Sequence, residues 1–202
     1  MSSWETIALP DAEVSLCSRW LEPAEADALL DTLLATVAWE THVIRIYGRE
    51  VASPRRSCWI GDPGASYVYS RTRFEPQPWP EALAALRPRL EQACGTPFNS
   101  VLANLYRDGR DAMGWHSDDE PELGPSPVIA SLSLGAERRF LFRRKAKGQP
   151  PALELRLPHG SLLRMAGATQ RLYQHALPRT ARVQAPRINL TFRWVRPSAT
   201  LP

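Results

Sequence analysis

Near its C-terminal end the chain reads Arg187-Ile188-Asn189-Leu190-Thr191-Phe192-Arg193-Trp194, and polar and apolar residues alternate throughout this segment. A period of two is typical of a β-strand, because successive side chains point to opposite faces of the sheet. One face then carries Arg187, Asn189, Thr191 and Arg193. A solvent-exposed edge strand would show the same alternation, but two arginines that enclose an asparagine and a threonine favour a polar binding site.

The same period of two recurs upstream of this segment, with Gly and Pro between the runs. It predicts short strands at about 99–106, 128–134, 139–144, 152–157, 161–165 and 187–195. Two helices are predicted before these strands. The first is Pro23 to Trp39, and the second runs from about Trp79 to Gly95, where Pro88 predicts a kink or two short pieces. Helices followed by many short strands are typical of an α+β fold with a sandwich or barrel of strands.

Length and composition limit the class of protein. A chain of 202 residues is long enough for one substantial core, and 44% hydrophobic with 23% charged residues is ordinary for a globular domain. No apolar run reaches the roughly 18 residues of a membrane span, and the first residues lack the pattern of a signal peptide. We therefore expect a soluble, intracellular protein. Cys17, Cys58 and Cys94 are far apart, which argues against a disulfide framework or a thiolate zinc site.

Positive charge is carried almost entirely by arginine. The formal net charge is +4, and Lys145 and Lys147 are the only lysines. Arginines gather in residues 45–73, and further cations gather in residues 138–147. Such clusters are suited to a polyanion, but ordinary solvated faces would look the same.

Candidate metal ligands begin with His116-Ser117-Asp118. In an extended backbone residues two apart point the same way, so His116 and Asp118 can offer an imidazole and a carboxylate to one point. His175 lies in an apolar segment and is the better third ligand, whereas His159 fits a turn or the surface. Two histidines and one carboxylate are the ligands of non-haem iron(II) oxygenases, although zinc hydrolases use the same set.

The polar face of the last strand favours an anionic ligand. Its two arginine Cα atoms are roughly 20 Å apart, which suits a short dianion such as a dicarboxylate lying between them. Asn104 and Tyr106 are also two residues apart and would add an amide and a phenol if their strand lies beside the last one.

Taken together these residues resemble the AlkB family of iron(II) and 2-oxoglutarate dependent nucleic-acid dealkylases. The family pattern occurs in order as Asn104 and Tyr106, His116 and Asp118, His175, and Arg187 to Arg193. The resemblance extends over about residues 40 to 195 and is greatest with the DNA-repair branch.

This resemblance implies a double-stranded β-helix, a jelly roll of two sheets with supporting N-terminal helices, in a single domain. Residues 1–95 would supply helical support and nucleotide-recognition hairpins, residues 96–196 the catalytic core, and residues 197–202 a flexible tail. Iron(II) would be held by His116, Asp118 and His175. The resemblance assigns the 2-oxoglutarate pocket to Asn104, Tyr106, Arg187, Asn189, Thr191 and Arg193.

The resemblance also implies substrate contacts in the first half of the chain and beside the metal ligands. Tyr69 would stack on the base and Tyr67 would hydrogen-bond to it, and Asp119 and Glu120 would be acids on the substrate side. A hairpin arm would carry an apolar wedge, for which the candidates are Ile46 and Tyr47. Two further candidates complete the set, Ser70 beside the base and Arg55 among the arginines that contact phosphates.

The implied reaction is oxidative demethylation of 1-methyladenine and 3-methylcytosine in DNA, with O2 and 2-oxoglutarate consumed and formaldehyde, succinate and CO2 released. A base inside a duplex must first be extruded. Alternatives are an oxygenase of the same fold acting on RNA, a small molecule or a protein side chain, and a non-catalytic nucleic-acid binding module. We expect a monomer without a membrane partner, cytoplasmic and nucleoid-associated in a bacterium or nuclear in a eukaryote.

Overall fold

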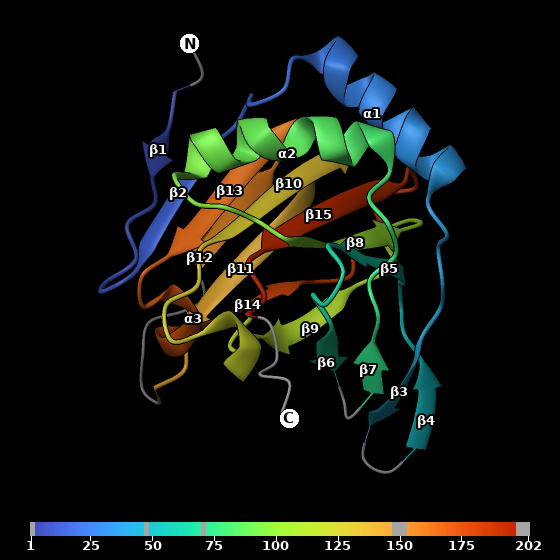
Figure 1. The fold of residues 1–202 in the computed structure, drawn as a ribbon. Helices are drawn as coiled ribbons and strands as arrows, with labels where there is room; N and C mark the ends of the chain where they lie inside the picture. The colour runs from blue at the N-terminus through green and yellow to red at the C-terminus, as the bar shows by residue number, and fades with distance from the viewer. Residues whose placement is uncertain (1–2, 47–48, 70–71, 147–152, 197–202) are drawn as a thin grey trace.

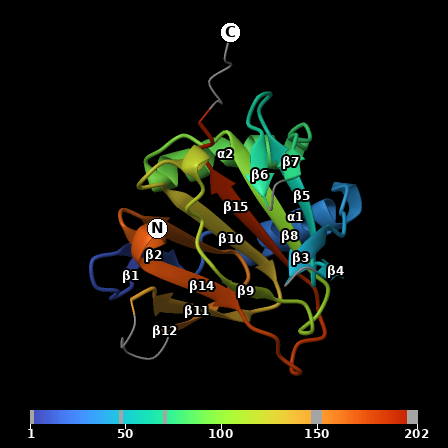
Figure 2. The same ribbon diagram turned by 90° about the horizontal axis from the view of Figure 1, so that it is seen from below.

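A computed structural model describes residues 3–46, 49–69, 72–146 and 153–196 of the chain. Two antiparallel sheets face each other (Figures 1 and 2). The larger has the order β1-β2-β13-β10-β15-β8-β5, and the smaller has the order β12-β11-β14-β9. This arrangement confirms the predicted α+β jelly roll. The predicted flexible tail, 197–202, lies outside the described residues.

The strand bounds are as follows. The larger sheet contains β1 (Glu5–Thr6), β2 (Glu13–Cys17), β5 (Arg56–Gly61), β8 (Ser100–Tyr106), β10 (Ile129–Gly135), β13 (Ser161–Ala166) and β15 (Arg187–Arg193). The smaller contains β9 (Met113–His116), β11 (Arg138–Arg144), β12 (Leu153–Leu157) and β14 (Tyr173–Leu177). Two short helical segments are α3 (Thr169–Leu172) and η1 (Pro121–Leu123).

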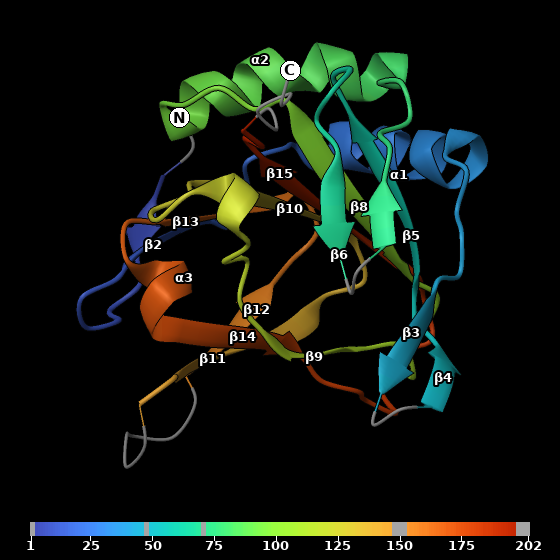
Figure 3. The same cartoon turned by 60° about the horizontal axis from the view of Figure 1, so that its bottom comes forward.

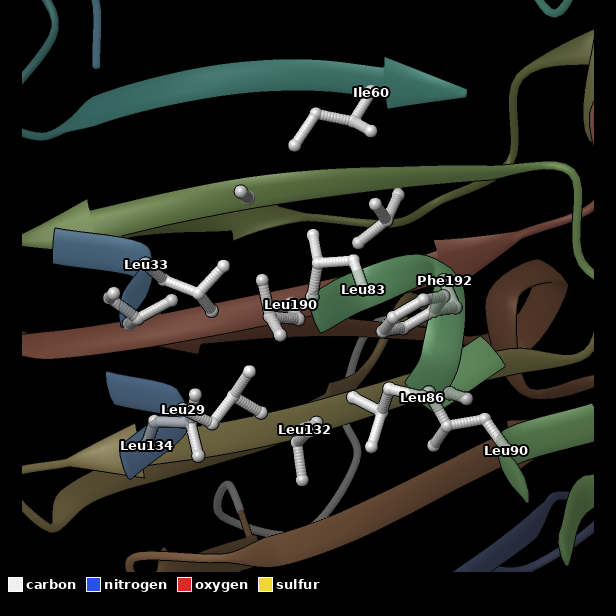
Figure 4. Packing of buried hydrophobic residues seen from close by; sticks show 14 of the residues in the cluster. Leu29, Leu33, Ile60, Leu83, Leu86, Leu90, Leu132, Leu134, Leu190 and Phe192 are labelled. Carbon is white, nitrogen blue, oxygen red and sulfur yellow. The ribbon is translucent and has the colours of Figure 1, made fainter. Parts of the chain in front are cut away.

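Two long helices, α1 (Pro23–Thr36) and α2 (Glu81–Cys94), cover the outer face of the larger sheet (Figure 1). Figure 4 shows their leucines packed on apolar side chains of the strands. Leu33 and Leu83 are fully buried there, as are Leu190 and Phe192 of β15. Burial of one such side chain contributes about 2 kcal/mol, so this layer accounts for much of the driving force for folding. It also explains why alternate residues of β15 are apolar.

Helix α2 continues through Pro88, so the predicted division into two pieces is wrong. Proline lacks the N–H that would bond to the carbonyl of Ala84. Both residues lie on the exposed face of the helix. Water can therefore solvate that carbonyl, and the buried leucine stripe on the other face keeps the helix in one piece.

The inner face of the larger sheet is different, because its centre is polar. Ser131 and Ser133 of β10 are buried there, in register with Thr191 and Asn189 of β15. A second apolar cluster, which includes Phe142 and Tyr173 of the smaller sheet, surrounds this polar centre. The fold thus places a hydrophilic floor inside an apolar sandwich.

Two hairpins lie beside the β5 edge of the larger sheet (Figures 1 and 3). One pairs β3 (Val43–Ile46) with β4 (Arg49–Ala52), and the other pairs β6 (Tyr67–Tyr69) with β7 (Thr72–Phe74). The hairpin arm expected around residue 46 is therefore present. None of the helices in the described part of the chain is long and apolar enough to cross a membrane.

Candidate active site

Three candidate metal ligands converge between the two sheets. His116 ends β9 and His175 lies directly opposite it on β14, while Asp118 follows β9 by two residues. One ligand atom from each of the three lies within 4.8 Å of the others. The Nε2 atom of His175 is 3.7 Å from Oδ2 of Asp118. The structure therefore brings together the three residues that the sequence singled out.

Burial keeps both imidazoles neutral. Burial, with a smaller contribution from the neighbouring His116, lowers the pKa of His175 to about 3. Burial likewise lowers the pKa of His116, against an opposing effect of Asp118. The Nδ1 atom of His116 lies 2.9 Å from the carbonyl oxygen of Gly114, so a neutral ring that donates there keeps a lone pair on Nε2. A neutral imidazole with a free lone pair is the form that binds a metal.

Asp118 is held as a carboxylate. It is 3% exposed, and burial alone would raise its pKa, but Arg193, His175 and His116 bring the pKa below its ordinary value. The Nη2 atom of Arg193 donates to Oδ1 of Asp118 at 2.5 Å. The backbone N–H of Asp118 donates to the side chain of Gln170 at 2.9 Å. Two neutral imidazoles and one oriented carboxylate fit a divalent iron ion.

Arg187 lies in the same inter-sheet region and is a buried cation without a carboxylate partner among the described residues. It is 2% exposed; Nη2 donates to the hydroxyl of Ser133 at 2.9 Å, and Nε has no hydrogen-bond partner. Its guanidinium lies 5.5 Å from the ring centroid of Tyr106. Burial, opposed by Tyr106 and assisted by Arg138, lowers the pKa of Arg187 to about 10. A desolvated guanidinium without a carboxylate partner is suited to binding an anionic ligand.

Asn104 lies beside the last strand as expected, because β8 pairs with β15 and places Asn104 opposite Asn189. Asn189 donates its amide N–H to Ser131 at 2.8 Å and accepts from Thr191 at 3.2 Å, so its amide is used within the sheet. Arg55 donates from Nε to Oδ1 of Asn104 at 2.7 Å. That bond leaves the amide N–H groups of Asn104 for another partner.

The structure places the expected substrate residues unevenly. Arg55, expected at a phosphate, is instead buried and bonded to Asn104 and to the hydroxyl of Ser53. Asp119 is exposed and forms an ion pair of 2.7 Å with Lys145, whereas Glu120 is partly buried. The backbones of Ile46, Tyr67 and Tyr69 lie in the two hairpins, but their side chains, with Tyr47 and Ser70, lie outside the described residues.

His159 is outside the site, as expected from its turn-like sequence. Its Nδ1 atom accepts the backbone N–H of Gly135 at 2.7 Å, and its Nε2 atom lies 3.2 Å from the carboxylate of Asp27. It therefore joins a turn to helix α1 and does not compete with His175 as a ligand.

Two residues beside the site were missed from the sequence. Gln170 holds the backbone of Asp118, and Arg138, the first residue of β11, is as buried as Arg187. From the sequence, Arg138 was one of the cations of residues 138–147, for which a polyanion-binding surface and an ordinary solvated face were both open. The available signal was its position: strand alternation puts Arg138, Phe140 and Phe142 on one face, and the two phenylalanines mark that face as buried.

Comparisons with known proteins agree with this geometry. The model of the 2OG-Fe(II) oxygenase superfamily matches residues 13–193. The human protein "Alpha-ketoglutarate-dependent dioxygenase alkB homolog 3" is 40% identical over 194 residues, which cover 92% of this chain and 67% of that protein. The mouse protein "DNA oxidative demethylase ALKBH2" is 41% identical over 184 residues, which cover 87% and 77%. The solved structure of OsALKBH1 superposes with a TM-score of 0.65 at 17% identity, covering 95% of this chain and all of that one, and so supports the fold alone.

Proposed function

The chain belongs to the AlkB family within the 2OG-Fe(II) oxygenase superfamily, and we propose that it removes methyl groups from ring nitrogens of DNA bases, 1-methyladenine and 3-methylcytosine above all. It is an iron(II) and 2-oxoglutarate dependent dioxygenase. The observation that carries the proposal is the cluster of His116, Asp118 and His175 between the two sheets. Arg187, a buried cation without a carboxylate partner among the described residues, faces the same inter-sheet region. Relatives named as DNA oxidative demethylases support the choice of substrate.

The division of labour in the site follows from its charges. His116, Asp118 and His175 would hold iron(II), which with O2 and 2-oxoglutarate supplies the oxidation of the N-methyl carbon that ends in release of formaldehyde. The protein's own task is orientation. Arg193 holds the carboxylate of Asp118, and the hydrogen bond of His116 to Gly114 holds one imidazole in place.

Cosubstrate binding would fall to the inner face of β8 and β15. Arg187 would bind the distal carboxylate, with the phenol of Tyr106 opposite it in the sheet. Asn104 would donate from the amide group that Arg55 orients. Asn189 and Thr191 would act one step further away, because their bonds to each other and to Ser131 keep the floor of the pocket rigid.

The hairpins β3–β4 and β6–β7 would hold the nucleic acid, since they project from the edge of the sheets beside the site (Figure 3). A methylated base that cannot pair is the easiest to extrude, and aromatic side chains then stack on it. Substrate contacts are proposed for Tyr67, Tyr69, Ser70, Ile46, Tyr47, Asp119 and Glu120. We further propose a monomer that acts where the genome lies, in the nucleus of a eukaryote or the nucleoid of a bacterium.

A repair assay tests the proposal. The purified protein, with iron(II), ascorbate and 2-oxoglutarate, is expected to convert 1-methyladenine in an oligonucleotide to adenine and to release an equal amount of formaldehyde. His116→Ala removes a metal ligand and is expected to abolish both products, whereas His159→Gln, outside the site, is expected to retain them. Turnover of 2-oxoglutarate without repair of methylated DNA would contradict the proposed substrate, and parallel reactions with methylated RNA distinguish the two nucleic acids.

A further inference from the structure

Arg138 is a buried arginine that has no part in the reaction described above. It is 2% exposed, and no carboxylate among the described residues forms an ion pair with it. Its Nη atoms donate to three backbone carbonyls, those of Asp108 at 3.1 Å, Asp111 at 2.9 Å and Pro178 at 2.7 Å. Its Nε atom is buried and has no hydrogen-bond partner. Burial lowers the pKa of Arg138, and the charges of Tyr106, Asp111 and Asp108 oppose this only in part. The guanidinium therefore still exerts a positive field on its surroundings.

Arg138 shares a neighbour with the proposed cosubstrate residue. Its guanidinium lies 5.9 Å from the ring centroid of Tyr106, and that of Arg187 lies 5.5 Å from the same centroid. Arg138 reaches this ring from the smaller sheet, whereas Arg187 is directly opposite Tyr106 in the larger one. Each of the two guanidinium groups lowers the stability of the charge on the other, and the lowered pKa of Arg187 contains this contribution. Two like charges around one ring are unfavourable unless an anion joins them.

The position of Arg138 is fixed by the chain around it. Two of its carbonyl partners lie just after Tyr106 at the end of β8, and the third lies three residues after His175 on β14. These two loops are bonded to each other, with Gly109 donating to Val183 and accepting from Thr180, both at 2.8 Å. A Cβ at Gly109 would lie 2.0 Å from the carbonyl oxygen of Thr180. The loops therefore form a rigid frame that holds the guanidinium still.

We infer that Arg138 is a second positive charge, beside Arg187, at the distal end of the 2-oxoglutarate pocket and determines the preference of the pocket for a keto acid with a charged distal end. The inference rests on the assignment of Arg187 to the distal carboxylate proposed above. Arg138 acts through its field and through Tyr106, so it is a specificity-determining and positioning residue and not a catalytic one. A clamp that merely joined two loops would need no charge beside Arg187.

The test measures binding, with no turnover. Isothermal titration calorimetry is run without oxygen on Mn(II)-loaded protein, with 2-oxoglutarate and with 2-oxopentanoate, which has the same keto acid end but a neutral distal end. Arg138→Gln is expected to weaken 2-oxoglutarate binding about tenfold, equivalent to about 1.4 kcal/mol, and to change 2-oxopentanoate binding by less than about twofold. Arg139→Gln is the matched control, because Arg139 is the next residue in β11 but is half exposed and paired with Glu154.

Equal weakening of both keto acids by Arg138→Gln, or no change in either, would overturn the inference. Arg138→Lys keeps the charge with fewer donors and is the second variant should the glutamine variant fail to fold. It is expected to keep the preference for 2-oxoglutarate within about twofold of the parent protein, and a tenfold loss of preference would overturn the inference as well. Arg187→Gln separates the two proposals. If this variant binds 2-oxoglutarate as tightly as the parent protein, the pocket itself is refuted. If Arg187→Gln weakens 2-oxoglutarate binding but Arg138→Gln does not, only the role of Arg138 is refuted.

Discussion

At the scale of single residues, buried charge defines this site. Arg187 and Asp118 are both almost fully buried, yet only Asp118 has an oppositely charged side chain beside it, that of Arg193. A buried ion pair keeps both charges in place, whereas a buried single charge lowers stability until a ligand compensates it. The metal end of the site is therefore complete in the protein, and the cosubstrate end depends on an anion from solution.

Arg187→Gln tests this difference. Without 2-oxoglutarate the variant is expected to be as stable as the parent protein or more stable by about 1 kcal/mol, because an uncompensated buried charge has been removed. Affinity for 2-oxoglutarate is expected to fall at least about a hundredfold, since a charge-assisted pair is lost. Urea unfolding gives the first quantity and titration calorimetry the second. A loss of several kcal/mol in the ligand-free protein would show that Arg187 is a structural residue instead.

The cysteines provide a second prediction at this scale. Burial, with a smaller effect of Glu40, raises the pKa of Cys58 to about 11, and burial also raises the pKa of Cys94 to about 11. The thiolate is the reactive form, so raising the pKa reduces reactivity at every pH below that value. At pH 8 the folded protein is expected to react with a disulfide reagent only on the time scale of unfolding, and all thiols should react at once in urea. Rapid labelling of Cys58 in the folded state would contradict its environment.

At the scale of secondary structure, the sequence predicts what local patterns control. The alternation of Arg187 to Arg193 correctly predicts where β15 begins. The alternation arises because one face of the strand packs against the helices and the other lies in the polar centre of the inner face. The predicted bounds of this strand and of the other predicted strands agree with the structure to within two residues. Strands β1 and β2 were missed, since β1 has only two residues and β2 only five, and the partner of β2 in the sheet, β13, is about 150 residues away in the sequence. Gln170 was missed because its partner, Asp118, is distant in sequence, whereas the burial of Arg138 could have been inferred from its alternation with Phe140 and Phe142.

Helix α2 offers a test of how packing overrides local preference. Pro88→Ala restores an N–H to the exposed face, and the free energy of unfolding is expected to rise by about 1–3 kcal/mol. Pro80→Ala is the matched control, because Pro80 precedes the first turn where no N–H bond is lost, and it is expected to change stability by about 0.5 kcal/mol or less. Urea unfolding of both variants measures the difference. A destabilising Pro88→Ala would mean that proline limits the unfolded chain more than it weakens the helix.

At the scale of the whole molecule, arginine supplies nearly all the positive charge, and the proposed substrate is a polyanion. Binding of an oligonucleotide is expected to weaken steeply as salt rises from 50 to 200 mM, by about tenfold or more if two or more phosphates are neutralised. Binding of 2-oxoglutarate, in a buried pocket, is expected to change much less over the same range. Fluorescence anisotropy and calorimetry measure the two. If oligonucleotide affinity does not change with salt concentration, the protein does not bind DNA through contacts to phosphates.

The two histidines that face each other across β9 and β14 have one more consequence for the molecule. Strand β9 is short and lies at the edge of its sheet, with hydrogen bonds to one neighbour only and a register shift one residue beyond His175. A metal ion bound by His116, Asp118 and His175 would link β9 to β14 and so stabilise this edge strand. When a chelator removes the metal ion, amide hydrogen exchange in Met113–Asp118 should therefore become faster. Exchange in β15, which is hydrogen-bonded to a strand on each side, should stay slow. Binding of the catalytic metal ion would thus complete the folding of the strand that supplies one of its ligands.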